Sequence, residues 1–553
     1  MALQAAERKL IEEYLGWWGD ARGFELAQVL AKAGEGPEHL NRAALAFTRL
    51  KQHLPISPVL AQNKAVINLI LGHGADIVTR QIALGKDALP ACLIHTDNMI
   101  MKLFVLPLMD NLVIRLRDET FPTEPQALWK YLEERVVTGT QVGAVKTIGD
   151  VTHRVLAGNT LLLVEGLDRA AEISTQGWDH RSPEEPIAEP VVRGPKEGFV
   201  ETAVINLVLI RRRLLDERLR TEMFTIGSRT NTTVYLVYMV ELAIPELVNE
   251  VRKRLSAIHV DNILESGVLE ELMEDSAYTP FPLMKATERP DVVAGELLEG
   301  KVALVIDGTP HALVAPATFV GGMQAAEDYY QRWPMATFIR FLRFAFLFIS
   351  LLGPSMYIAI TTFHPEMLPT DLLLSLAVAR EGVPFPAVIE AILMEISFEA
   401  LREAGVRLPK TVGQTVSIVG ALVIGEAAVR ARLVSPVMVI VVAITGIASF
   451  VIPNYSTALA IRLLRFPMMM LAGTLGFFGL VIGLIALSIH LASLRSFGIP
   501  YMAPTMPPTP DDFKDMMIRM PWWAMKRRPR FMPMHDPKRQ KQATIPKPPS
   551  SMS

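Results

Sequence analysis

The sequence predicts a mixed fold class, α/β plus membrane α-helical: two tandem, similar α/β cytoplasmic subdomains followed by a multi-span helical bundle. The first observation is a set of apolar runs, each close to the ~20 residues that cross a ~30 Å hydrocarbon layer, at 344–362, 412–428, 437–452 and 468–491. The second is that the residues before them hold no such run and contain matching segments instead. We therefore expect a soluble part, a bundle of about four spans and a basic tail.

The bulk composition fits that division. A chain of 553 residues is too long for one core and predicts roughly three or four domains at ~150 residues each. Half of the residues are hydrophobic, which the bundle accounts for. The single cysteine, Cys92, excludes an internal disulfide and fits a reducing compartment. Charged residues from Glu7 to Glu13 interrupt any apolar run, so we expect no signal peptide and a cytoplasmic soluble part.

Four stretches make up the soluble part. Residues 1–50 are rich in alanine and predict a helical extension. Residues 51–178 and 199–334 alternate helical stretches with short strands and predict α/β subdomains I and II. Residues 179–198 between them are rich in Pro, Glu and Arg without periodicity, which is typical of a linker.

The two subdomains share a repeated pattern. The segment 158–166 (GNTLLLVEG) matches 300–308 (GKVALVIDG), and 92–95 matches 235–238 at nearly the same spacing. We interpret the acid–glycine pairs of the first two segments as hairpin turns, because glycine supplies the positive φ that a two-residue turn needs. A carboxylate placed for a ligand is the alternative. A duplication also creates an interface between two similar cores, which is a common place for ligands.

A strongly charged stretch, 209–223, lies near the start of subdomain II. Its opposite charges, three to five positions apart, predict a helix with a solvated face. A contact between subunits is the second interpretation.

Several ordered motifs resemble the GerA family of spore germination proteins. The first consists of residues at the start of subdomain II: Arg193, Gly194, Pro195, Glu197, Gly198, Arg211 and Arg213. Further matches lie at 288–291, 361–366, 379–386, 414–425 and 489–504. The similarity extends from about residue 88 to about residue 540.

The resemblance implies an integral protein of the inner membrane of bacterial endospores, with its soluble domains and tail on the cytoplasmic, or core, side. The family's A subunit works beside a transporter-like B subunit, which senses the germinant, and a lipoprotein C subunit. The resemblance also implies a homo-oligomeric ring, a pentamer being one form, that gives monovalent cations a path. A SpoVAF-type relative of the same build, which amplifies the response, is an alternative within the family.

The bundle, 335–495, follows the positive-inside rule at its start. Arg340 and Arg343 precede the first span and place that end on the cytoplasmic side. Gly353 and Pro354 predict a kink within the span. Because both chain ends are expected inside, the number of spans must be even.

Charged residues also fall within the bundle. Residues 385–404 cannot form a simple span, because three glutamates would be costly in lipid: Glu390, Glu395 and Glu399. The apolar residues between them predict an amphipathic helix that lies in the membrane interface or lines a wet cavity. The segment 454–465 carries Arg462 and Arg465 on the side we assign as outside, which conflicts with the positive-inside rule.

The segment 411–432 is the most suggestive for function. It mixes apolar residues with small and polar ones: Gln414, Ser417, Ala421, Gly425 and Glu426. Small residues at helical spacing predict close helix packing. Alternatively this face lines a pore, where Gln414 and Ser417 meet water and Glu426 sets a cation preference. A salt bridge from Glu426 to Arg430 would weaken that charge.

The tail, 496–553, is basic between residues 519 and 541. It predicts a cytoplasmic retention signal first and a contact with membrane lipid headgroups second. Because no aromatic platform or basic fold accompanies it, we expect no nucleic acid partner. The chain has no phosphate-binding loop, no histidines at metal-ligand spacing and no defensible Ser/His/Asp order, so we expect neither an enzyme nor a cofactor.

These observations predict a membrane subunit of a spore germinant receptor that forms an oligomeric, nutrient-gated ion pathway and triggers germination. Two alternatives stay open: a SpoVAF-type accessory subunit that amplifies the signal, and a scaffold that clusters receptors without conducting ions.

Overall fold

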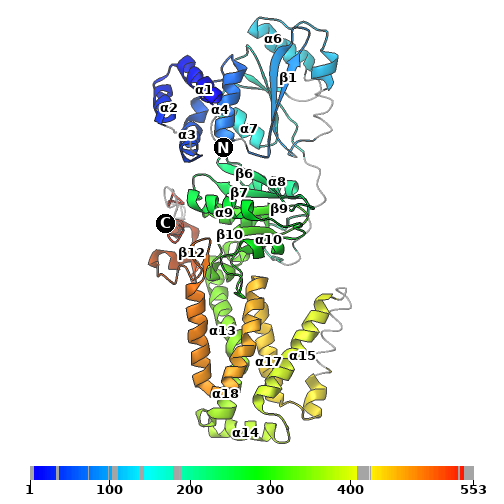
Figure 1. The fold of residues 1–553 in the computed structure, drawn as a ribbon, viewed down its shortest axis with the longest axis vertical. Helices are drawn as coiled ribbons and strands as arrows, with labels where there is room; N and C mark the ends of the chain where they lie inside the picture. The colour runs from blue at the N-terminus through cyan, green and yellow to red at the C-terminus, as the bar shows by residue number, and fades with distance from the viewer. Residues whose placement is uncertain are drawn as a thin grey trace, which may run out of the picture.

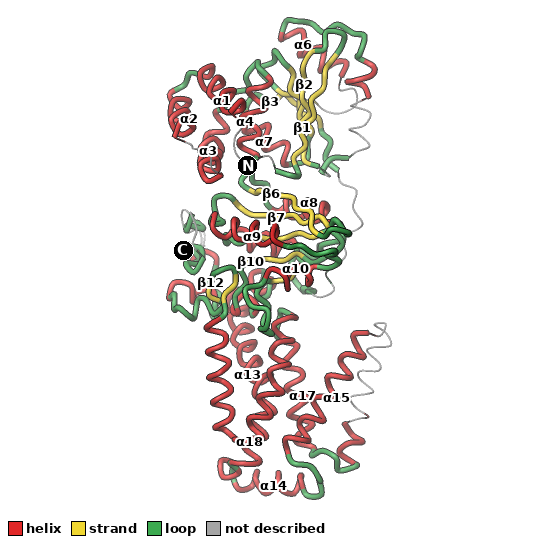
Figure 2. The backbone as a smooth tube through the Cα atoms, viewed as in Figure 1, coloured by secondary structure: helices red, strands yellow, loops and turns green. Residues whose placement is uncertain are grey.

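The protein is an elongated stack of three tiers (Figure 1). The computed structural model describes residues 5–32, 37–72, 74–97, 99–101, 110–136, 142–177, 186, 189–407, 423, 425–532 and 536–540. Two β-sheets, yellow in Figure 2, form the first and second tiers, and a bundle of helices forms the third.

Three N-terminal helices pack onto the first tier: α1 (Ala5–Trp18), α2 (Ala21–Lys32) and α3 (Pro37–Leu50). The expected helical extension is therefore present. Ile11, Tyr14 and Phe47 are buried in one hydrophobic cluster with residues of α4 (Leu60–Leu71). The Tyr14 hydroxyl also donates a hydrogen bond to the Pro55 carbonyl at 2.6 Å. The extension is thus part of the core of subdomain I.

Subdomain I is built on a five-stranded antiparallel sheet with strand order β1-β2-β4-β5-β3. The strands are β1 (Ile77–Leu84), β2 (Leu89–Thr96), β3 (Val142–Val145), β4 (Thr160–Val164) and β5 (Ala170–Ile173). Helices α4 and α7 (Ile148–Leu156) cover one face, and α6 (Pro125–Tyr131) covers the other. Every residue of β4 is buried, because its side chains alternate between the two cores.

Subdomain II has a sheet with the corresponding strand order, β6-β7-β9-β10-β8. The strands are β6 (Leu219–Ile226), β7 (Thr232–Met239), β8 (Lys285–Thr287), β9 (Val302–Ile306) and β10 (Ala312–Ala315). Helices α9 (Pro245–Ala257) and α10 (Ser266–Met273) cover one face, and α8 (Ala203–Arg213) and α11 (Pro290–Leu298) cover the other. The segments matched in the sequence form β4 and β9, which hold the same position in the two sheets.

The acid–glycine pairs lie in hairpin connections, but these are five residues long, 165–169 and 307–311, rather than two. Gly166 and Gly308 have φ of 87° and 92°, as a left-handed turn position requires. Glu165 Oε2 accepts a hydrogen bond from Leu60 N at 2.8 Å, and Asp307 Oδ1 accepts one from Ala203 N at 3.0 Å. Each carboxylate thus satisfies a backbone donor at the start of α4 or α8.

The expected helix over 209–223 is wrong beyond residue 213. Helix α8 ends at Arg213, and β6 begins at Leu219. Between them the Asp216 side chain accepts from the backbone N of Arg218 at 2.9 Å, which stabilises a turn. The charged residues do not form one solvated face either, because Arg211 and Arg220 are buried.

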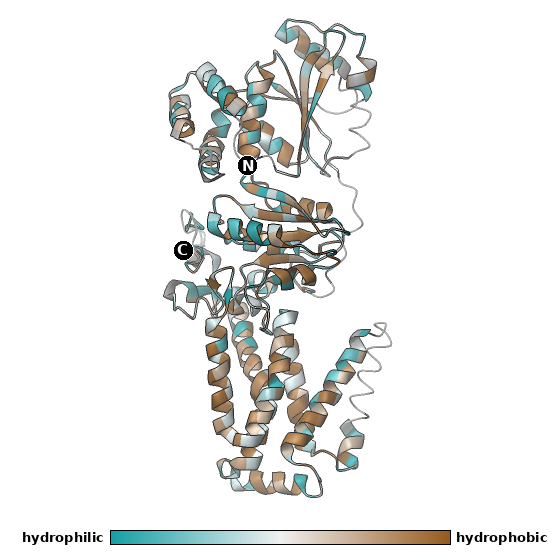
Figure 3. Cartoon of the chain, viewed as in Figure 1, coloured by the Kyte–Doolittle hydropathy of each residue, from teal (hydrophilic) through white to brown (hydrophobic). Residues whose placement is uncertain are grey.

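The third tier holds α13 (Trp333–Phe363), α14 (Thr370–Arg380), α15 (Ala387–Arg407), α17 (Pro436–Phe450) and α18 (Tyr455–Ser493). By length and composition, α13 and α18 are able to cross a membrane, and α17 is a shorter apolar helix. Hydrophobic residues, brown in Figure 3, dominate these helices. The spans expected at 344–362 and 437–452 fall on α13 and α17, and Pro354 lies inside α13 without ending it. The span expected at 412–428 lies outside the described residues apart from 423 and 425–428.

The single span expected over 468–491 is wrong, because α18 reverses direction at Gly476 (Figure 1). This glycine has φ of 61° and ψ of −139°, which no helix contains. A Cβ added to Gly483 would lie 2.6 Å from Met468 Sδ, although 15 residues of continuous helix would separate the two by ~22 Å. The two halves of α18 therefore run antiparallel.

Both ends of α18 lie beside subdomain II. Thr457, near its start, contacts Gly322, and His490 Nε2 lies 3.0 Å from Thr279 Oγ1 near its end. Hence the segment 454–465, expected on the side away from the soluble tiers, begins on their side. On the expectation that the soluble tiers are cytoplasmic, Arg462 and Arg465 then no longer conflict with the positive-inside rule.

The basic tail folds against subdomain II. After the short hairpin of β11 (Arg495–Ser496) and β12 (Ile499–Pro500), the chain runs back along the second tier. Arg528 Nε donates to the Leu298 carbonyl at 2.7 Å, and Arg539 pairs with Glu299. The described part of the tail is thus a packed element of the soluble domain.

Candidate functional site: paired charges in the bundle and at its head

Helix α15 carries the three glutamates that the sequence singles out, and the structure pairs each with arginine. Glu395 is fully buried and its Oε2 lies 2.5 Å from Arg465 Nη1 of α18. Arg465 Nε also donates to the carbonyl of Ser350 at 2.8 Å, and Nη2 to the Ser350 hydroxyl at 3.2 Å. Since Ser350 belongs to α13, this one cluster joins α13, α15 and α18.

A second pair lies one helical turn further along α15. Glu399 Oε2 accepts from Arg462 Nη1 at 3.0 Å, and Glu399 Oε1 lies 3.4 Å from Arg402 Nη1. The Arg402 guanidinium lies 4.4 Å from the centroid of the Phe450 ring and donates to the Ser449 hydroxyl at 2.9 Å. This cluster connects α15 with α17 and α18, and a cation–π contact adds to the charge pairing.

The third glutamate anchors the other end of α15. Glu390 is fully buried; its Oε1 lies 3.3 Å from Arg380 Nη2 of α14. Its Oε2 accepts from Ser435 N at 2.9 Å, just before α17 begins. Helix α15 packs against α13, α17 and α18 with Glu390 and Glu395 buried and Glu399 partly exposed. The interfacial and cavity-lining interpretations of 385–404 both stay predictions.

An ionised side chain in an apolar bundle is costly unless it is paired, and such residues mark functional sites in membrane proteins. Here the two arginines of α18 neutralise the glutamates of α15 across the helix interface. Arg462 and Arg465 were not predicted as partners of these glutamates. Glutamates in one otherwise apolar segment and arginines in another are a signal that could have found them.

The structure describes two of the candidate pore residues, Gly425 and Glu426. Gln414, Ser417 and Ala421 lie outside the described residues. Gly425 is half-buried, and the exposed Glu426 pairs with Arg430 at 2.5 Å, the arrangement that weakens its charge. Pore lining by this segment stays a prediction.

At the head of the bundle, Arg340 and Arg343 are buried rather than free interfacial charges. Both contact Asp328, at 2.8 and 2.9 Å. Arg340 Nη1 also lies 2.8 Å from Asp515 Oδ1 of the tail, and the Tyr329 hydroxyl donates to Asp515 Oδ2 at 2.8 Å. Burial and the neighbouring Asp515 raise the pKa of Tyr329 well above its ordinary value, so it stays a donor. This cluster fixes α13 to the tail and to the segment that leaves subdomain II.

The family-motif residues fall into two groups. Arg211 Nη2 lies 2.7 Å from Asp76 Oδ2 of subdomain I, in a pair that is buried on both sides. Glu197 binds Arg212 and Arg213, each at 2.8 Å, which closes the start of subdomain II onto α8.

The remaining motif residues shape the loop before subdomain II. The Arg193 backbone N donates to Glu327 at 3.2 Å, and the Pro195 carbonyl accepts from Arg289 at 2.8 Å. Gly194 has φ of 142°, and a Cβ there would lie 2.6 Å from the Tyr330 ring. Gly198 is buried. These residues therefore hold the linker against the segment that leads into α13.

Polar contacts also join subdomains I and II. Asp76 Oδ1 accepts from Thr221 Oγ1 at 2.6 Å. Arg220 donates to the carbonyls of Ile70 and Leu71, both at 3.0 Å, at the end of α4. A cation at a helix C-terminus is favourable, although burial lowers the pKa of Arg220 to about 10. Lys51 and Thr152 both bind Glu217 nearby.

Comparison with known proteins finds relatives along most of the chain. The family model described as Bacillus/Clostridium GerA spore germination protein matches residues 65–531. Spore germination protein KA of Bacillus subtilis (strain 168) is 45% identical over 498 residues, covering 90% of this chain and 91% of that relative. Spore germination protein GerLA of Bacillus cereus is 39% identical over 469 residues, covering 84% of this chain and 94% of that relative. One match is to a crystal structure, that of the N-terminal domain of the A subunit of the Bacillus megaterium spore germinant receptor GerK3. The two sequences are 32% identical, the match covers 48% of this chain and 97% of that chain, and the TM-score is 0.38.

Proposed function

The chain belongs to the GerA family of spore germination proteins, and we propose that it is the A subunit of a germinant receptor whose bundle forms part of an ion pathway. The subunits assemble into a homo-oligomeric ring, with a pentamer as one form, in the inner membrane of the endospore. A nutrient sensed by a transporter-like B subunit opens the pathway to monovalent cations, and a lipoprotein C subunit completes the complex. The soluble tiers and the tail face the core side.

The observation that carries this proposal is the line of paired charges on α15. Glu395 and Glu399 pair with Arg465 and Arg462 of α18, and Glu390 pairs with Arg380 of α14. Breaking such an ion pair in apolar surroundings costs free energy. The helices that the pairs join therefore move together, or the glutamates exchange their arginine partners together. An arrangement of this kind supports two discrete packings of α15, one closed and one open to ions.

The head cluster supports transmission from the soluble tiers to this line. Asp328 binds both Arg340 and Arg343 on α13, and Ser350 of the same helix binds Arg465. A displacement of subdomain II therefore reaches α13 first and the Glu395–Arg465 pair next. We infer that a rearrangement of the partner subunits acts along this route.

Potassium flux from liposomes tests the proposal, with the protein reconstituted alone and with its B and C partners. Glu395→Gln should change nutrient-dependent flux, because it removes the charge that holds Arg465. Glu403→Gln is the matched control, since this glutamate of the same helix is exposed in a surface pair with Arg407. Ala421→Trp should reduce flux if 411–432 lines the pore.

Two outcomes would replace the proposal. A folded oligomer that conducts no ions under any condition, with or without partners, identifies a scaffold that clusters receptors. Flux that needs no B or C partner, together with a gene neighbourhood that lacks B and C genes, favours a SpoVAF-type amplifying subunit.

A further inference from the structure

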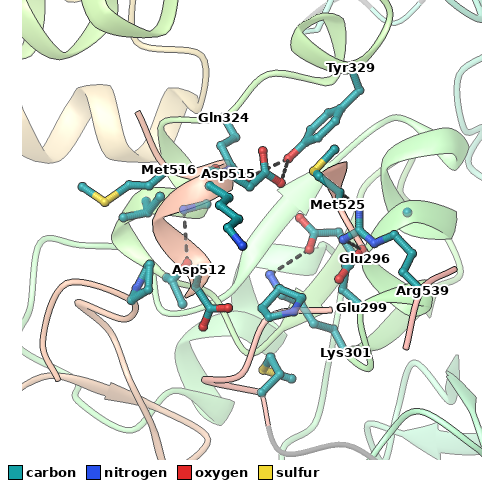
Figure 4. Close-up of a pocket in the computed structure, with 18 of the residues that line it drawn as sticks. Glu296, Glu299, Lys301, Gln324, Tyr329, Asp512, Asp515, Met516, Met525 and Arg539 are labelled. Carbon is teal, nitrogen blue, oxygen red and sulfur yellow. Dashed lines mark hydrogen bonds and ion pairs between the residues drawn. The ribbon is translucent and has the colours of Figure 1, made fainter. Parts of the chain in front are cut away.

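A cavity of about 510 Å³ lies between subdomain II, the head of the bundle and the C-terminal tail. Figure 4 shows that its walls come from segments far apart in the sequence. Subdomain II supplies Glu296 and Lys301, and the tail supplies Trp522, Met525 and Arg539. Cavities of a few hundred cubic ångströms, with apolar walls and a few convergent polar groups, are typical of ligand sites.

The lining carries more positive than negative charge. Six basic side chains (Lys285, Lys301, Lys514, Lys526, Arg527 and Arg539) and five acidic ones (Asp291, Glu296, Glu299, Asp512 and Asp515) line it. Asp291 and Asp515 pair with Arg289 and Arg340, which lie outside the lining. Six basic and five acidic side chains therefore line the cavity, and two of the acids are also shared with arginines beyond it, so the lining has a small excess of positive charge.

Part of the excess positive charge is buried, at a cluster where two lysines share one carboxylate. Glu296 Oε1 lies 2.9 Å from Lys285 Nζ, and Glu296 Oε2 lies 2.7 Å from Lys301 Nζ. Lys301 is 6% exposed. Burial alone would raise the pKa of Glu296, but the ammonium groups of the two lysines hold this pKa well below its usual range. These three groups carry one net positive charge, which the nearby carboxylates of Glu189 and Asp291 offset in part.

The cavity lies at the level where α13 enters the apolar layer. The backbone N of Arg519 donates to Thr337 Oγ1 in the first turns of α13 at 3.2 Å. Large apolar side chains are exposed at this level on both segments: Trp333, Met335 and Phe338 of α13, and Met517, Ile518, Trp522 and Trp523 of the tail. Tryptophans beside basic residues are typical of a membrane–water interface, where phospholipid headgroups lie.

We propose that this cavity binds the phosphate or carboxylate group of an amphiphilic anion, with the Lys285–Glu296–Lys301 cluster as its counter-charge. The interfacial position favours the headgroup of an anionic phospholipid as the source, and a free small anion that carries the same phosphate or carboxylate group is the other source of the same chemistry. The bound anion would join Lys301 of subdomain II to the tail residues opposite it. This inference does not depend on ion conduction.

Thermal unfolding of the full-length protein in neutral detergent tests the proposal, with phosphatidylglycerol, phosphatidylcholine or glycerol phosphate added. We expect phosphatidylglycerol to raise the unfolding midpoint and phosphatidylcholine to leave it unchanged. Lys301→Met should weaken the apparent affinity by about tenfold or more, because it removes a charged hydrogen-bond donor. Glu296→Gln should strengthen it, because it frees a second positive charge.

The exposed Lys253 of α9 provides a matched control, and Lys253→Met should bind like the unaltered protein. If glycerol phosphate acts as well as phosphatidylglycerol at equal headgroup concentration, the source is a free anion and the site stands. Anion-independent midpoints, or equal affinities in Lys301→Met and Glu296→Gln, would overturn the proposal. If one variant fails to fold, the other still decides, because their expected effects have opposite sign.

Discussion

Replacing Asp76 with alanine should weaken the contact between subdomain I and subdomain II. Asp76 accepts from Arg211 Nε at 3.0 Å and Nη2 at 2.7 Å, and from Thr221 Oγ1 at 2.6 Å. The pair is at least nine-tenths buried on both sides, so Asp76→Ala leaves the Arg211 guanidinium in a dry interface without its counter-ion. Arg220 lies close by and would then repel it. Breaking a buried pair in this way costs about 3–5 kcal/mol.

The assay is urea unfolding of the full-length protein in detergent, followed by tryptophan fluorescence. Asp168→Ala is the matched control, because Asp168 pairs with Arg169 at the surface with 60% of its side chain exposed; it should cost about 0–1 kcal/mol. Asp76→Ala combined with Arg211→Met removes both charges and should recover part of the loss. Equal free energies of unfolding for Asp76→Ala and Asp168→Ala would refute the reasoning from burial.

Two further predictions concern a titrating glutamate and the turn in α18. Burial raises the pKa of Glu270 from an ordinary value of 4.5 to about 7, and repulsion from Glu274 and Glu265 adds to the shift. The folded state therefore binds this proton more tightly than the unfolded state does. The free energy of unfolding should fall as the pH rises from about 4.5 to 7. Glu270→Gln should flatten this dependence in thermal unfolding measured from pH 4.5 to pH 8, and an unchanged slope would contradict the assignment. Gly476→Ala should destabilise the bundle by about 1–3 kcal/mol, because alanine is strained at φ of 61° and its Cβ would lie 3.0 Å from Phe363. Gly425→Ala, whose Cβ would make an ordinary 3.8 Å contact, is the control in the same thermal assay in detergent, and equal midpoints would argue against the reversal.

Local patterns were enough to predict the two strands at the centre of the sheets and the apolar helices α13 and α17. Strands β4 and β9 are five-residue apolar runs bounded by glycine turns, which is a pattern typical of buried strands. Strand β6 was missed because arginines and acids around it resemble a charged helix face. The side chains of Arg211 and Arg220 find partners in subdomain I, more than 100 residues away, which a local pattern cannot show.

The reversal of α18 was missed for a different reason. Gly473, Gly476, Gly479 and Gly483 recur at helical spacing, and that spacing predicts close packing as readily as a turn. Only the backbone conformation at Gly476 separates the two. The Glu395–Arg465 pair was beyond a local pattern as well, because its two partners lie 70 residues apart in the sequence.

The turn at Gly476 also limits how the soluble tiers can move. One connection, from Tyr329 to Trp333, leads from subdomain II into α13, and a second returns from α18 through β11 and β12 to the same subdomain. A domain with one covalent connection to the bundle can rotate about that connection, whereas two connections side by side restrict the domain to tilting or to moving along the bundle axis. Rotation of subdomain II about this axis is therefore restricted. A tilt of subdomain II would displace α13 and the second half of α18 in opposite directions along the axis.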